Sequence, residues 1–111
     1  MSKRQLKLYV EDINASIDNI QNFTKDLTYT KFKRNKLVID AVIRNLAVIG
    51  EAAKNIPKDV KDKHLEIAWH KILSMRNRMV HEYFNLDLEI VWKTISKDLP
   101  KLKEQIKELS K

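Results

Sequence analysis

Residues 37–57, LVIDAVIRNLAVIGEAAKNIP, decide the fold because their apolar side chains recur at helical spacing. These side chains stand mostly three or four positions apart and cover more than one side of the predicted helix: Leu37, Ile39, Val42, Ile43, Leu46, Ile49, Ala53 and Ile56. Such a helix either lies at the centre of a bundle or packs its second side on another subunit. Pro57 marks its end, since the residue before a proline is pushed out of the α conformation.

Three residues are unusual within so apolar a helix. Gly50 costs about 1 kcal/mol relative to Ala in a helix interior, so its presence predicts a close crossing by another helix. Arg44 and Glu51 are charged, and a buried charge needs a partner. We therefore expect one of them to be paired, or to face a cleft near the polar motif described below.

The composition extends the helical prediction to the whole chain. It holds one Gly, two Pro and no Cys in 111 residues, whereas strand-rich folds need Gly at turns and bulges. The shortage of Gly excludes Walker and dinucleotide phosphate loops, and the absence of Cys excludes thiolate metal sites and Cys nucleophiles. The length fits one domain, residues 1–111.

Periodicity and capping residues predict the other helices. The first covers about residues 3–26, after which Thr28 or Thr30 can cap a helix that begins in the Lys-rich segment. A loop or one loose turn is expected over residues 58–66, and a third long helix from about residue 67 or 69 to residue 84.

The C-terminal part divides into two predicted segments. Asp87 is a good N-cap for residues 88–96, and Asp98 can cap a last helix with Pro100 in its first turn. The fold predicted from these elements is all-α, an antiparallel four-helix bundle with an additional short C-terminal helix.

Positive charge indicates a possible polyanionic partner. The chain has 22 Lys and Arg against 15 Asp and Glu, a net charge of +7, with the densest cluster at residues 31–36. Such a surface attracts RNA through counterion release, although a solvated Lys-rich helix start explains the cluster about equally well. The candidate RNA contacts are Lys33, Arg34, Lys36 and Arg78. The sequence shows no apolar leader and no uncharged apolar segment of membrane-spanning length, so we expect a cytoplasmic protein without membrane contact.

The polar residues that do not fit a plain bundle lie at 76–83, RNRMVHEY. On a helix, Asn77 and His81 share one face, whereas Arg76 and His81 diverge by about 140°. One unbroken helix therefore cannot aim both at a small target. Either the helix ends near His81, or the site is shared between two copies of the chain.

This set of side chains suits a phosphodiester. The imidazole of His81 can exchange protons near neutral pH, and Arg76 offers a charged planar fork to phosphate oxygens. Asn77 can orient either group, and Tyr83 can stack on a base. The plainer alternative is a helix end with a dipole-stabilising His, surface arginines and a packed Tyr.

The order Arg76-Asn77-x3-His81 resembles the signature of HEPN domains, and the extension to Tyr83 is similar to that of the HepT branch. Three further segments also resemble HepT proteins, so the likeness covers nearly the whole chain: residues 49–53 (IGEAA), 69–72 (WHKI) and 87–92 (DLEIVW). The resemblance implies a homodimer whose two motifs share one cleft and cleave RNA without a metal or other cofactor. It implies that His81 is the general base or acid, that Arg76 stabilises the transition state and that Asn77 supports them.

The resemblance also implies a partner. HepT proteins are the toxins of HepT/MNT toxin–antitoxin systems of type VII-like organisation, and an MNT-type nucleotidyltransferase antitoxin transfers AMP to the motif Tyr, here Tyr83. A bulky negative group two residues from His81 would fill the cleft and repel RNA. The alternatives are a non-catalytic HEPN module, which binds RNA or nucleotide or serves as regulatory partner subunit of a nucleotidyltransferase, and a plain helical interaction domain.

Overall fold

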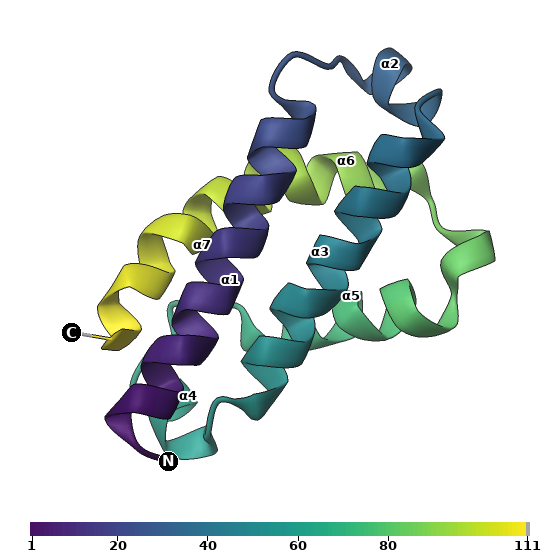
Figure 1. Ribbon diagram of the computed structural model, residues 1–111. Coiled ribbons are helices and arrows are strands. Elements are labelled where there is room, and N and C mark those ends of the chain that lie inside the picture. The colour runs from purple at the N-terminus through teal and green to yellow at the C-terminus, as the bar shows by residue number, and fades with distance from the viewer. Residues whose placement is uncertain (111) are drawn as a thin grey trace.

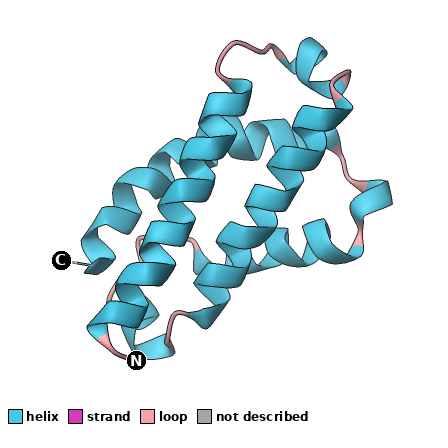
Figure 2. Ribbon diagram, in the orientation of Figure 1, coloured by secondary structure: helices cyan, strands magenta, loops and turns pink. Residues whose placement is uncertain are grey.

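The computed structural model describes residues 1–110, and its described residues form helices and short connections without a strand (Figure 2). The all-α prediction is therefore confirmed. α1 and α3 lie side by side and run in opposite directions, while α6 and α7 follow one another along one line (Figure 1). Among the described residues, no helix is long and apolar enough to cross a membrane.

The first helix, α1 (Lys3–Thr24), begins at a capping box. The Ser2 hydroxyl accepts the Gln5 backbone N–H at 3.1 Å, and the Gln5 side chain accepts the Ser2 N–H at 3.2 Å. Two orphan donors of the first turn are thereby satisfied. The predicted apolar stripe is buried along this helix: Val10, Ile13, Ile17 and Ile20.

The Lys-rich segment is a junction between two helices. The cap predicted at Thr28 or Thr30 is confirmed at Thr28, whereas the prediction of a single helix after it is wrong. Thr28 caps α2 (Tyr29–Lys33), and Asn35 caps α3 (Lys36–Asn55) by accepting the Val38 N–H at 3.1 Å. The Asn35 side chain competes with the helical backbone and starts a new helix. The far end is as predicted, because Ile56, before Pro57, is extended and closes α3.

After α4 (Lys58–Asp62), a single short helix in the predicted connector, α5 covers Trp69–His81. It ends three residues before the predicted Phe84. Glu82 leaves the α region with φ −122° and ψ 27°, and a separate 3₁₀ turn follows at Tyr83–Asn85.

The C-terminal segments are continuous rather than separate. Asp87 caps α6 (Leu88–Lys93) as predicted, but residues 94–98 form a π-helical turn that joins α6 to α7 (Leu99–Ile106). Pro100 has no N–H to donate, and the Leu99 N–H bonds to the Thr94 carbonyl, one residue farther back than in an α-helix. Asp98 makes no cap bond; it pairs with Lys71 of α5 at 2.9 Å.

The core forms where these helices meet. α3 packs on α1 along one side and on α5 along the other, and α7 and the final turn at 107–110 pack on α1. α3 thus packs on two sides within one chain, which confirms the central position that its sequence allowed, although Leu37 and Val48 of this helix stay exposed. Fully buried side chains of α3 include Val42, Leu46, Ile49 and Ala53.

Candidate active site

The contact between α3 and α5 is unusually close at Gly50. A Cβ built on Gly50 would lie 2.1 Å from Cβ and 2.6 Å from Cγ of Arg76, and 3.2 Å from its Cα. Any side chain at position 50 would occupy the space of the Arg76 stem. The close crossing predicted from this glycine is confirmed, and it places Arg76 against α3.

The guanidinium of Arg76 is held by two neighbours. Its Nε and Nη2 atoms lie 3.0 and 2.9 Å from one carboxylate oxygen of Glu51, and Nη1 donates to the Asn77 side chain at 3.0 Å. The Arg76 side chain is only 20% exposed. The expected pairing of Glu51 is confirmed, whereas Arg44 is exposed to solvent. Because a guanidinium has five N–H donors, two remain for a phosphate.

Tyr83 is anchored to α3 on the other side of the motif. Its hydroxyl donates a hydrogen bond to the carboxylate of Asp40, and its ring is half-buried. This hydrogen bond, with burial of the ring, raises the pKa of Tyr83 above its ordinary value of 10.0. The ring packs edge-on against Phe84, with centroids 5.2 Å apart, and Phe84 itself is 94% exposed.

His81 is the last residue of α5 and is exposed, as is Asn77 one turn earlier. Of the two arrangements that the motif spacing allowed, the helix does end at His81. Both Arg76 and His81 nevertheless lie within α5, so their directions still diverge by about 140°. Arg76 faces α3, and His81 points away from that crossing.

The candidate RNA contacts lie in three places. Arg34 and Lys36 are exposed at the junction of α2 and α3, and Lys36 stands one turn before Asp40. Lys33 lies over the Tyr29 ring, 5.6 Å from its centroid. Arg78 is exposed on the side of α5 that faces α6. The structure brings Lys36 near the Tyr83 end of the motif and separates Arg78 from Arg76.

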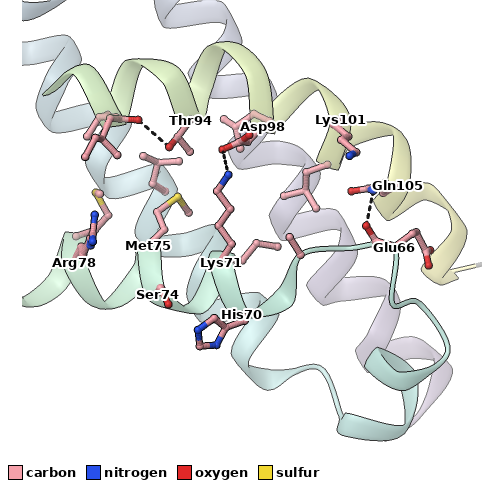
Figure 3. A pocket seen from close by; sticks show the side chains of 18 residues that line it. Glu66, His70, Lys71, Ser74, Met75, Arg78, Thr94, Asp98, Lys101 and Gln105 are labelled. Atoms are coloured by element: carbon pink, nitrogen blue, oxygen red, sulfur yellow. Dashed lines mark hydrogen bonds and ion pairs between the residues drawn. The ribbon is translucent and has the colours of Figure 1, made fainter. Parts of the chain in front are cut away.

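A groove of about 460 Å³ runs between α5 and the rod formed by α6 and α7 (Figure 3). Lys71 reaches across it to Asp98, and Gln105 donates to the Glu66 carbonyl at 2.8 Å. Arg78 is the motif side chain that reaches this groove together with buried Met79; the polar set Arg76, Asn77 and His81 does not line it. The groove is therefore separate from the candidate active site.

One contact of the motif had no sequence signal of its own. Asp40 reads as a polar interruption of an apolar helix, and only the fold shows that it meets Tyr83, 43 positions later. Among the described residues, no group of three or more His, Asp or Glu side chains is arranged to hold a metal ion.

The fold and this motif together define an all-α protein with an Arg/His motif on α5. The family described as "Ribonuclease HepT-like" matches residues 13–109. The chain is 41% identical over its full length to "Putative RNase MJ0125" of Methanocaldococcus jannaschii, covering 96% of that protein. It is 43% identical, over 98% of its length and 99% of the relative, to "Probable ribonuclease HepT" of Thermococcus cleftensis. No solved structure gives a significant match.

The chain belongs to the HepT-like ribonuclease family. A third relative, "Putative RNase TTE0752" of Caldanaerobacter subterraneus, is 36% identical over 91% of this chain and 90% of its own length. The family identity predicted from the sequence is confirmed, and the family and the names of these relatives support the predicted class of enzyme, an RNase.

Proposed function

We propose that the protein is the toxin of a HepT/MNT-type system, a cytoplasmic homodimer that cleaves RNA without a metal ion. The observation that carries the proposal is the Arg76 guanidinium, which is held by Glu51 and Asn77 and belongs to the same helix, α5, that ends at the exposed His81. The Arg76 side chain does not have to be ordered when substrate arrives, so this part of the cost of organising the site is already met in the fold.

In the proposed reaction, His81 takes the proton of the ribose 2′-hydroxyl, whose oxygen attacks the adjacent phosphorus. The bond from phosphorus to the 5′-oxygen breaks, leaving a cyclic phosphate; the 5′-oxygen receives a proton from water, and the protonated His81 releases its proton to solvent. Arg76 directs its two remaining N–H donors to the phosphate oxygens as negative charge redistributes over them. Asn77 holds the orientation of Arg76 through its side-chain oxygen.

Pairing of two copies completes this site. Arg76 and His81 diverge within one chain, so a neighbouring copy supplies the complementary group from the other side. Large apolar side chains are exposed on α3 and at the end of α5, around the motif: Leu37, Val48, Val80 and Phe84. Burying them between two copies would stabilise a dimer with the motifs at its interface.

Adenylylation of Tyr83 by an MNT-type nucleotidyltransferase is the proposed means of inhibition. The phenol oxygen attacks the α-phosphorus of ATP, pyrophosphate leaves, and the phenol proton is lost. The modified oxygen no longer donates to Asp40, and the new phosphate brings a negative charge towards that carboxylate. AMP would thus displace the turn beside His81 as well as block access of RNA.

Cleavage of labelled RNA in the presence of EDTA tests the catalytic proposal. We expect products with cyclic phosphate ends, and a loss of about 10²–10⁴-fold in rate for His81→Ala. Intact mass after incubation with an MNT-type nucleotidyltransferase and ATP tests inhibition, because the chain should gain AMP and Tyr83→Phe should not. Cleavage by His81→Ala at the unaltered rate would contradict the catalytic proposal.

One observation favours the second candidate, a non-catalytic module that binds RNA or nucleotide or acts as regulatory partner of a nucleotidyltransferase. The charge of Arg76 is already compensated by Glu51 within the chain. Such a module would bind labelled RNA and leave it intact in the same assay.

A further inference from the structure

Two carboxylates of α3 contact the two ends of the motif. Asp40 and Glu51 stand eleven positions apart, which is three helical turns and within about 20° of the same direction from the axis. Glu51 binds the guanidinium of Arg76, and Asp40 accepts the hydroxyl of Tyr83. One face of α3 therefore holds both ends of the segment that contains His81.

The Glu51 contact fixes the rotation of the Arg76 side chain. Two nitrogen atoms, Nε and Nη2, share one oxygen of Glu51. The close approach of Gly50 to the Arg76 stem brings the guanidinium within reach of this oxygen. An arginine side chain has many rotamers in solution, so the anchor removes freedom that a catalytic arginine would otherwise lose in the transition state.

The Asp40 contact fixes the chain just beyond the helix. Tyr83 belongs to the 3₁₀ turn after α5, and its bond to Asp40 ties this turn to α3. His81 lies five residues after Arg76 and two before Tyr83. A helix end anchored at one point can still twist about its axis, whereas anchors on both sides of His81 restrict that movement.

We infer that Asp40 and Glu51 are positioning residues for RNA cleavage, holding Arg76 and the His81 end of α5 in register along α3. Neither carboxylate is a catalytic residue, because each acts through the side chain that it binds. The inference rests on the proposed ribonuclease function. If the inference is right, Glu51 has two opposite kinetic effects. Its negative charge weakens RNA binding by Arg76, whereas its contact with the guanidinium holds Arg76 in place for the chemical step.

The test measures kcat and KM on a labelled pool of random-sequence RNA oligonucleotides. Glu51→Gln should lower kcat by about tenfold or more without raising KM, since the charge-assisted contact that positions Arg76 is weakened while a repelling charge is removed. Glu51→Asp, which keeps the carboxylate, should recover part of kcat. Asp40→Asn should lower kcat as Tyr83→Phe does. The double variant Asp40→Asn/Tyr83→Phe should have the same kcat as Tyr83→Phe alone, because both substitutions remove the same contact.

Asp62→Asn is the matched control, because Asp62 pairs with Lys58 at 2.8 Å on the exposed α4 and touches no motif residue. It should cleave as the unaltered protein does. If the unaltered protein leaves RNA intact, the proposed function fails, and this inference with it. If the unaltered protein cleaves while Glu51→Gln and Asp40→Asn keep its kcat, the inference alone is overturned. The inference is also overturned if kcat falls only in proportion to the loss of thermal stability of each variant and Glu51→Asp does not recover it.

Discussion

The two sides of α3 are built from different chemistry. Towards α1, the helix buries aliphatic side chains, and one amide pair, Asn19 to Asn45 at 3.2 Å, lies at the rim. Towards α5 and the 3₁₀ turn that follows it, α3 has a glycine and two carboxylates that bind motif residues. The first side stabilises the fold by excluding water, and the second packs on α5 as well but also holds polar groups in place. This division predicts that substitutions on the two sides affect different measurements.

The largest expected effect is on stability, from the α1 side. Ile17 is fully buried in the stripe of α1, so Ile17→Ala should lower the free energy of unfolding by about 2–5 kcal/mol through lost burial and a cavity. Urea unfolding measures this. The cleavage rate per folded molecule should stay unchanged, and a parallel fall in that rate would break the division.

Next is Gly50→Ala, at the contact with α5. The added methyl must displace Arg76, at a cost of about 1–3 kcal/mol, while the higher helix propensity of Ala returns about 1 kcal/mol. We expect the free energy of unfolding to fall by up to about 2 kcal/mol and RNA cleavage to fall with it, because Arg76 moves. A more stable protein with unchanged cleavage would contradict the close crossing.

The Tyr83 anchor should appear as a pH effect on stability. Its folded pKa is raised above 10.0, mainly by the hydrogen bond to Asp40, so the neutral phenol is the form that the fold favours. Its contribution is fully present below the unfolded pKa and is lost as pH rises through the folded pKa. The free energy of unfolding, measured on both sides of pH 10, should fall more steeply with rising pH for the unaltered protein than for Tyr83→Phe. Equal slopes would mean that Asp40 does not bind the hydroxyl.

The smallest effect is expected at the polar rim of the α1 side. Asn19→Ala removes one exposed hydrogen bond and adds a better helix former, so the free energy of unfolding should change by no more than about 0.5 kcal/mol. Cleavage should not change. A loss of cleavage here would show that polar contacts on both sides of α3 serve the site.

The central helix and the close crossing at Gly50 could be predicted from the sequence, because local spacing and the presence of a glycine within an apolar helix indicate them. The pairing of Glu51 also followed, since a charge among apolar residues needs a partner. The break at Asn35 and the continuous path from α6 to α7 could not be predicted from the sequence. Each depends on whether a capping side chain or the continuing backbone hydrogen-bonds to the free backbone groups at the helix end. Asp40 was missed for another reason: its contact with Tyr83 comes from the tertiary fold, between residues 43 positions apart.

The most direct test of the proposed shared site mixes two inactive chains. Arg76→Ala and His81→Ala are prepared separately, combined under conditions that exchange subunits, and assayed for RNA cleavage. A mixed dimer holds one unaltered Arg76 and one unaltered His81 on different chains, so cleavage should return on mixing. If each variant is inactive alone and the mixture, with exchange verified by mass, stays inactive, the two residues do not act across a dimer and the account is contradicted.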